Sequence, residues 1–222
     1  MKTNRRNFIQ LASAALATVA MPLPSMATPN GSKLLKTGDA GPDENYWKMV
    51  RKQFPLNKNL VYLNNGTMGP SPYSVIESMQ KGMMEADVDG SYGGWENTCK
   101  KLAAFVGGHE DEIALTRNVT EGINIVAQGL PLGKGDEVIM TTHEHVGNAL
   151  PWINIQKQKG IIIRTFTPAP TADETLNRIA ALINKRTKAL AIPHIPCTQG
   201  QVLPAKRISK LGKEKGLFVF ID

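Results

Sequence analysis

Asp222 directly follows an apolar segment, residues 217–221, whose composition is typical of a buried strand. A carboxylate at the end of such a strand is costly unless an opposite charge or a hydrogen-bond donor lies beside it. A cationic ligand nitrogen would supply that charge, and a structural partner such as a helix N-terminus would serve equally. Because α/β proteins bind ligands beyond the carboxyl ends of their strands, Asp222 is a candidate for chemistry.

A second candidate is Asn118-Val119-Thr120, which opens a predicted helix. The first N–H groups of a helix have no acceptor within it and carry a partial positive charge, so they accept phosphate. The Thr120 hydroxyl would add a donor. A plain helix cap at Thr120 explains the same residues and is the simpler interpretation of the local sequence. The chain has no Gly-x-Gly-x-x-Gly and no Walker loop, so dinucleotide and nucleoside-triphosphate sites lack their fingerprints.

The segment His143-Glu144-His145 suggests two kinds of site. Two histidines separated by one residue can chelate a metal, and His194 or Cys197 would complete the ligand set. Their spacing matches no strong zinc signature. A single histidine stacked on an aromatic ligand and an ordinary surface loop remain alternatives.

The elements that must position these residues alternate along the chain. Helix-period and strand-like segments follow one another, which indicates right-handed crossovers and a mostly parallel sheet with helices on both faces. A (β/α) barrel shares this pattern. Strands are predicted over residues 113–116, 137–140, 161–166, 189–192 and 217–221, and helices over 96–106, 120–129, 146–158, 176–183 and 205–213.

All the candidate residues follow predicted strands. The carboxyl ends of parallel strands meet at one edge of the sheet, where ligands bind. The sequence therefore predicts one crevice lined by these loops. They are residues 117–122 after the first strand, 143–145 after the second, His194 with 197–200 after the fourth, and Asp222 after the fifth.

The charge and the cysteine content give little support to nucleic-acid binding or to a disulfide. The 222 residues carry a formal net charge of +7, without a Lys/Arg-rich run interleaved with aromatics, so nucleic-acid binding is not implied. Cys99 and Cys197 are the only cysteines. They could pair in an exported chain, but nothing in their spacing requires it, and two buried free thiols are the simpler interpretation.

The N-terminus has the layout of an export signal. Arg5-Arg6 precedes Phe8 and a short apolar stretch, and Ser25-Met26-Ala27 places small residues where a signal peptidase cleaves. Twin arginines mark bacterial export. We therefore expect a twin-arginine signal peptide over residues 1–27 and a periplasmic protein without a stable membrane anchor. Cleavage would remove three cations and lower the formal charge from +7 to +4.

Four segments together resemble the class V aminotransferases, a family of fold-type I pyridoxal-phosphate enzymes that includes cysteine desulfurases and isopenicillin-N-epimerase-like proteins. The resemblance runs in order from Tyr46 to Asp222. It implies a lead-in and arm over residues 28–70 and the N-terminal part of the cofactor-binding large domain over 71–222. The segments are residues 62–70, 116–124, Glu144-His145 with Asn148 and Pro151-Trp152, and 218–222.

The resemblance also implies roles for the candidate residues. Val119 and Thr120 would hold the phosphate of pyridoxal 5'-phosphate at a helix N-terminus. His145 would stack on the pyridine ring. Asp222 would pair with the pyridinium nitrogen and keep it protonated, so that the ring can act as an electron sink.

Further roles come from the same resemblance. Asn65 and Gly66 would line the substrate side, and Cys197 would border the cofactor's 3-hydroxyl, where many relatives have Asn. Family members form a Schiff base through a lysine on a strand downstream of the Asp222 position. The chain ends before such a lysine, so we expect an inactive N-terminal part of an enzyme that is a homodimer when complete.

The predicted function is a pyridoxal-phosphate-dependent transformation of a small amino-acid substrate, by transamination, epimerisation or C–S cleavage. Two alternatives stay open. One is an exported, non-catalytic α/β binding protein. The other is a metal-dependent hydrolase that uses His143, His145 and His194.

Overall fold

The computed structural model describes residues 43–90 and 93–222. The predicted signal peptide and the start of the predicted lead-in lie outside these residues. The chain divides into two compact units, Met1–Tyr92 and Gly93–Asp222. Within the described residues, none of the helices is long and apolar enough to cross a membrane.

The described part of the first unit is helical. It contains α2 (Glu44–Arg51), α3 (Asn65–Met68) and α4 (Tyr73–Asp89). Asp43 caps α2, because its carboxylate accepts a hydrogen bond of 2.8 Å from the Tyr46 N–H. Gly90 ends α4 in the left-handed region at φ +61°, where a side chain would be strained.

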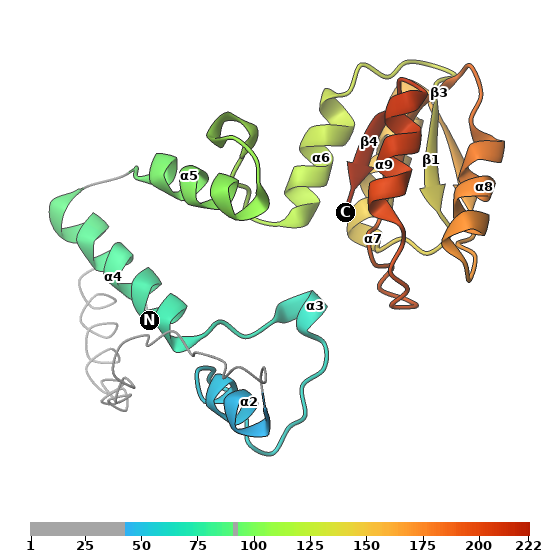
Figure 1. The fold of residues 1–222 in the computed structure, drawn as a ribbon. Helices are drawn as coiled ribbons and strands as arrows, with labels where there is room; N and C mark the ends of the chain where they lie inside the picture. Colours follow the sequence, from blue (N-terminus) through green and yellow to red (C-terminus); the bar gives the residue numbers. More distant parts are fainter. Residues whose placement is uncertain (1–42, 91–92) are drawn as a thin grey trace, which may run out of the picture. The chain divides into compact units, whose positions relative to one another are not determined.

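The second unit is built on a parallel four-stranded sheet of order β2-β1-β3-β4 (Figure 1). Each strand predicted from residue 137 onward is confirmed. The strands are β1 (Glu137–Thr141), β2 (Ile162–Phe166), β3 (Thr187–Ile192) and β4 (Phe218–Ile221), and the helices are α5 (Trp95–Val106), α6 (Val119–Gly129), α7 (Val146–Lys159), α8 (Ala172–Leu182) and α9 (Ala205–Glu214), with a 3-10 turn η1 (Glu110–Glu112).

Helices cover both faces of this sheet, as the continuous apolar strands predict. On one face, Val138 and Met140 pack with Ala127 of α6 and Trp152 of α7. On the other face, a second apolar cluster joins the sheet to α8 and α9; it contains Ile139, Leu190, Ile192, Ile179 and Ile208. Successive residues of β1 therefore point to opposite faces and are buried on both. The expected α/β fold with helices on both faces is confirmed, and in the described part of the chain the sheet is open, with β2 and β4 at its edges.

Two sequence predictions before β1 are wrong. Residues 113–116 are apolar enough for a strand, but they have no ladder partner among the described residues, and Leu115 is half exposed. A strand needs a hydrogen-bonding neighbour, which local composition cannot supply. The following helix is capped by Asn118 and not by Thr120, because the Asn118 side chain accepts a 2.9 Å hydrogen bond from the Glu121 N–H.

The cysteines are free, as predicted, but they are not both buried. Cys99 of α5 is partly buried, and its Sγ lies 3.8 Å from the Ile113 carbonyl oxygen. Cys197 is exposed in the loop after β3. The prediction for Cys197 is wrong because the sheet buries β3 itself and not the loop beyond its carboxyl end.

Candidate functional site

The ends of β3 and β4 hold Asp222 in place. The strands pair in parallel, with Ile192 opposite Ile221. The Asp222 N–H then donates to the Ile192 carbonyl at 3.0 Å, and the Asp222 carbonyl accepts from the His194 N–H at 2.7 Å. The backbone of Asp222 is thus fixed on both sides, which leaves its side chain to act at the carboxyl edge of the sheet.

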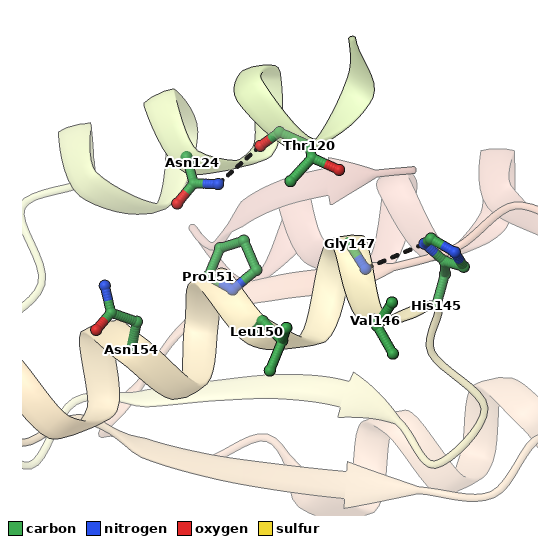
Figure 2. Close-up of a pocket in the computed structure, with 8 residues that line it drawn as sticks. All are labelled: Thr120, Asn124, His145, Val146, Gly147, Leu150, Pro151 and Asn154. Carbon is green, nitrogen blue, oxygen red and sulfur yellow. Dashed lines mark hydrogen bonds between the residues drawn. The ribbon is translucent and has the colours of Figure 1, made fainter. Parts of the chain in front are cut away.

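A cavity of about 410 Å³ lies between the start of α6 and the start of α7 (Figure 2). It brings together Thr120 and His145, which the sequence placed in the loops after two different strands. Thr120 comes from the first turn of α6, and His145 is the N-cap of α7. The other lining residues are Asn124, Val146, Gly147, Leu150, Pro151 and Asn154.

Gly147 allows this close approach. A Cβ atom at Gly147 would lie 2.8 Å from the Thr120 hydroxyl oxygen and 3.0 Å from the His145 Nδ1. The Gly147 N–H donates a 3.0 Å hydrogen bond to this Nδ1 (Figure 2). Since Nδ1 is the acceptor, a neutral His145 ring carries its proton on Nε2. Sequence reasoning missed Gly147. The sequence does contain a signal for it: a glycine, which weakens a helix, stands in a predicted helix two residues after a candidate histidine.

The N-terminus of α6 offers free donors. The Asn118 side chain caps the Glu121 N–H, while the N–H groups of Val119 and Thr120 have no acceptor within the helix. Val119 and Asp222 line a second cavity, of about 410 Å³. The Arg117 guanidinium is engaged by Glu121 at 2.9 Å, and its hydrogen bonds hold the pKa of the Glu121 carboxyl below its usual range.

The Asp222 carboxylate has a perturbed pKa. It is half-buried, and this burial raises its pKa, while the neighbouring His145 acts in the opposite direction. No ion pair forms on its side chain within residues 43–90 and 93–222. A cationic group placed beside it would stabilise the charged form.

Glu144 belongs to two of the sequence motifs, but the sequence predicted no role for it. Its Oε1 accepts from the Thr141 N–H at 2.9 Å and from the Thr141 hydroxyl at 2.7 Å, and its Oε2 accepts from the Asn148 amide at 2.7 Å. Burial raises the pKa of Glu144, these hydrogen bonds oppose the rise, and the negative charge of nearby Asp222 adds to it.

The histidines do not assemble into a metal centre. The His143 ring nitrogens lie 3.4 Å from the Thr198 hydroxyl and 3.1 Å from the Gln199 amide nitrogen, whereas the His145 ring faces Gly147. The described hydrogen bonds of His194 are made by its backbone: its N–H donates to the Asp222 carbonyl, and its carbonyl accepts from the Leu203 N–H. The part of the chain that the structure describes contains no group of three or more His, Cys, Asp or Glu residues arranged to hold a metal.

Cys197 is not among the residues that line the cavity between α6 and α7, and Asn65 and Gly66 belong to the first unit. Cys197 is in the turn after β3 that also carries the partners of His143. Asn65 lines a cavity of about 460 Å³ within the first unit, with Trp47 and Tyr62 among its neighbours. Gly66 is in the short helix α3. The substrate-side role of Asn65 and Gly66 stays a prediction.

Comparison with known proteins places this geometry in a family. The sequence model described as Aminotransferase class-V matches residues 62–222. A cysteine desulfurase of Serratia proteamaculans is 30% identical over 194 residues, which cover 78% of this chain and 48% of that protein. A probable cysteine desulfurase of Methanothermobacter thermautotrophicus is 28% identical over 78% of this chain and 46% of its own length. The chain spans about half the length of these relatives.

A solved structure agrees with the sequence match. A variant of the cystine C-S lyase C-DES, with glycine covalently linked to its pyridoxal-phosphate cofactor, is similar with a TM-score of 0.67 and 26% identity. The match covers 78% of this chain and 49% of that one. The family match extends over the sheet, the cavity between α6 and α7, and Asp222, and the chain therefore belongs to the class V aminotransferase family.

Proposed function

We propose that this chain forms the phosphate- and ring-binding side of a pyridoxal 5'-phosphate site in an enzyme that transforms a small amino acid. One observation carries the proposal: Thr120 at the start of α6 and His145 at the start of α7 line one cavity. Membership of the class V aminotransferase family supports it.

The phosphate fits the N-terminus of α6. The free N–H groups of Val119 and Thr120 and the Thr120 hydroxyl are donors, and the helix end carries partial positive charge. Gly147 leaves open the space that a Cβ would fill between Thr120 and His145. A phosphate group held here would receive donors from α6 without a clash from α7.

The pyridine ring of the cofactor would contact His145 and Asp222. His145 is oriented by the Gly147 N–H and would hold the ring by stacking. Asp222 would pair with the protonated ring nitrogen, which would give its half-buried carboxylate a salt bridge that it does not make within residues 43–90 and 93–222. Both residues would orient the ring, and Asp222 would hold the proton on its nitrogen.

Bound pyridoxal phosphate supplies an electron sink for an amino-acid substrate. We propose C–S cleavage as the reaction of the whole enzyme, because the relatives compared above are cysteine desulfurases. Transamination and epimerisation are the alternative reactions. The three reactions give different products from an amino acid, so identifying the product distinguishes them. Within the two cavities that carry Thr120, His145 and Asp222, none of the lining residues is a lysine. The 222-residue chain is thus proposed to bind the cofactor non-covalently and without turnover.

Binding of the cofactor tests this proposal. The chain is titrated with pyridoxal phosphate, and the change in cofactor absorbance gives a Kd. Thr120→Ala, His145→Ala and Asp222→Asn should each weaken binding, and inorganic phosphate should compete. Thr171→Ala is the matched control, since Thr171 caps α8 and lines neither cavity of the site. A chain that binds no pyridoxal phosphate would favour the non-catalytic binding protein, and retention of a metal by His143 and His145 would favour the hydrolase.

The proposal includes a periplasmic destination. Arg5-Arg6 and the apolar stretch after them motivate it. The twin-arginine route carries folded proteins, so it suits a protein that takes up its cofactor before export.

A further inference from the structure

Glu144 is the centre of a hydrogen-bond network that joins the end of β1 to the first turn of α7. Three donors converge on its carboxylate: the Thr141 N–H, the Thr141 hydroxyl and the Asn148 amide, at 2.9, 2.7 and 2.7 Å. Thr141 and Asn148 are both buried. His145 is the next residue along the chain and caps α7, accepting the Asn148 and Ala149 N–H groups on its carbonyl.

The network continues to β4, the strand that Asp222 follows. The Asn148 Oδ1 accepts a 3.1 Å hydrogen bond from the Trp152 indole N–H. Trp152 is fully buried, and its ring packs edge-on against Phe220 of β4 with ring centroids 6.5 Å apart. Phe220 precedes Asp222 by two residues, so one chain of contacts runs from Glu144 to both sides of the candidate site.

We propose that Glu144 is a positioning residue, whose carboxylate fixes the His145 imidazole over the cavity by tying Thr141 to Asn148. Glu144 lines neither of the cavities that carry Thr120 and Asp222, so it acts through its neighbours. The effect on the cofactor rests on the proposed function, whereas the effect on the imidazole does not.

The chemistry of the three donors requires an acid at this position. A glutamine offers one acceptor oxygen and one NH₂ group, which only donates. If that oxygen faces Thr141, the amide faces the Asn148 amide, and turning Asn148 over would break its bond to Trp152. Glu144→Gln therefore leaves a mismatched donor inside the protein, which is expensive. Asn148→Asp alone sets two carboxylates against each other.

The reciprocal exchange removes both faults. In Glu144→Gln with Asn148→Asp, the glutamine oxygen accepts from Thr141 and its amide donates to the new aspartate. That aspartate also accepts from Trp152, so every donor again has an acceptor. Rescue of both single variants by the double variant is the behaviour expected of a hydrogen-bond network. Thr141→Val is a milder variant that keeps the backbone donor and removes the hydroxyl, which donates to Glu144 and accepts from the His143 N–H at 3.1 Å.

Glu137 provides a matched control at the opposite end of β1. Glu137 is a fully buried carboxylate, whereas Glu144 is partly buried; Glu137 is paired with Arg186 at 2.8 Å and accepts from the Asn184 amide at 2.7 Å. Glu137→Gln should lower the Tm while leaving the site unchanged.

The test uses the 222-residue chain and two measurements. Nitrogen NMR of the His145 imidazole, without cofactor, should show one tautomer with the proton on Nε2 in the wild type, in the double variant and in Glu137→Gln. Glu144→Gln and Asn148→Asp should show a mixture or a broadened signal, and Thr141→Val a smaller shift in the same direction. The Kd for pyridoxal phosphate should rise about tenfold in each single variant of the network and return to within about threefold in the double variant.

Three results would overturn the proposal: an unchanged imidazole spectrum in folded Glu144→Gln and Thr141→Val, a double variant as defective as the single ones, or an equal spectral change in Glu137→Gln. If the wild type binds no pyridoxal phosphate, the proposed function fails, and the imidazole spectra still decide the role of Glu144.

Discussion

The Thr120 hydroxyl and the His145 imidazole converge on one backbone position, Gly147. A Cβ there would lie 2.8 Å from the one and 3.0 Å from the other. The two residues come from different helices, and each follows a different strand-like segment of the sequence. This convergence turns two separate sequence motifs into one cavity.

Gly147→Ala should therefore separate stability from binding. Alanine is favoured over glycine by about 0.5–1 kcal/mol in the middle of a helix. Gly147 is the second residue of α7, and its added methyl group meets Thr120, so we expect these opposing effects to leave the Tm nearly unchanged. The added methyl group displaces Thr120 and His145, and the Kd for pyridoxal phosphate should rise about tenfold. Thermal unfolding and a cofactor titration measure the two effects. Gly129→Ala at the end of α6 is the control, because nothing lies within 4 Å of a Cβ at that position; equal affinity in both variants would contradict the cavity's role.

Substitutions of Asn118 and Thr120 should have opposite effects on stability and on ligand binding. Asn118 caps α6, so Asn118→Ala should lower the free energy of unfolding by about 0.5–2 kcal/mol. Thr120 makes no capping bond of this kind, so Thr120→Ala should cost little stability and should weaken phosphate and pyridoxal-phosphate binding. Denaturant unfolding and titration with each ligand test the pair. A larger loss of stability in Thr120→Ala than in Asn118→Ala would mean that Thr120 is the cap.

Asp222 should make the free chain less stable as the pH rises. Burial raises its pKa in the folded protein, so the folded state binds its proton more tightly than the unfolded state. The free energy of unfolding then falls as the pH climbs from the ordinary aspartate range through the raised pKa. Glu144, whose pKa burial also raises, contributes with the same sign.

The Asp222→Asn variant isolates this effect. The difference in unfolding free energy between the wild type and Asp222→Asn is measured against pH by denaturant titration. The wild type should lose stability relative to the variant across that window. A difference that grows in favour of the wild type with rising pH would mean that Asp222 is stabilised by a partner in the free protein.

Pyridoxal phosphate should bind the 222-residue chain without a specific covalent link. The residues that line the two cavities of the site include no lysine. After borohydride treatment, peptide mapping should find no single stoichiometric lysine adduct, and no amino acid should be turned over. One stoichiometric adduct accompanied by turnover would show that this chain is a complete catalyst.

Export should depend on Arg5 and Arg6. Replacing both by Lys keeps the formal charge, yet it should hold the protein in the cytoplasm, because the twin-arginine route reads the arginine pair. Cell fractionation with an antibody measures the distribution, and a single conservative change in the apolar stretch, Leu11→Ile, serves as the control. Periplasmic protein in the double variant would remove the basis for the proposed destination.

The sequence predicted the strands of the sheet from residue 137 onward because parallel strands buried on both faces are apolar throughout. It failed over residues 113–116 because a strand needs a hydrogen-bonding partner from another part of the chain, and local composition does not encode that partner. It assigned the cap of α6 to Thr120. The cap is Asn118, two residues earlier, whose side chain accepts from the Glu121 N–H.

The identity of the chemical groups was determined by the sequence alone: a threonine at a helix start, a histidine and an acid after strands, and a family resemblance that links them. Their proximity was decided only by the tertiary structure. Gly147 permits Thr120 and His145 to meet, and Glu144 accepts donors from Thr141 and from Asn148 across a turn. The physical reason is that patterns of residue type report burial and period, whereas close packing and hydrogen-bond satisfaction depend on atoms that the fold brings together from different elements.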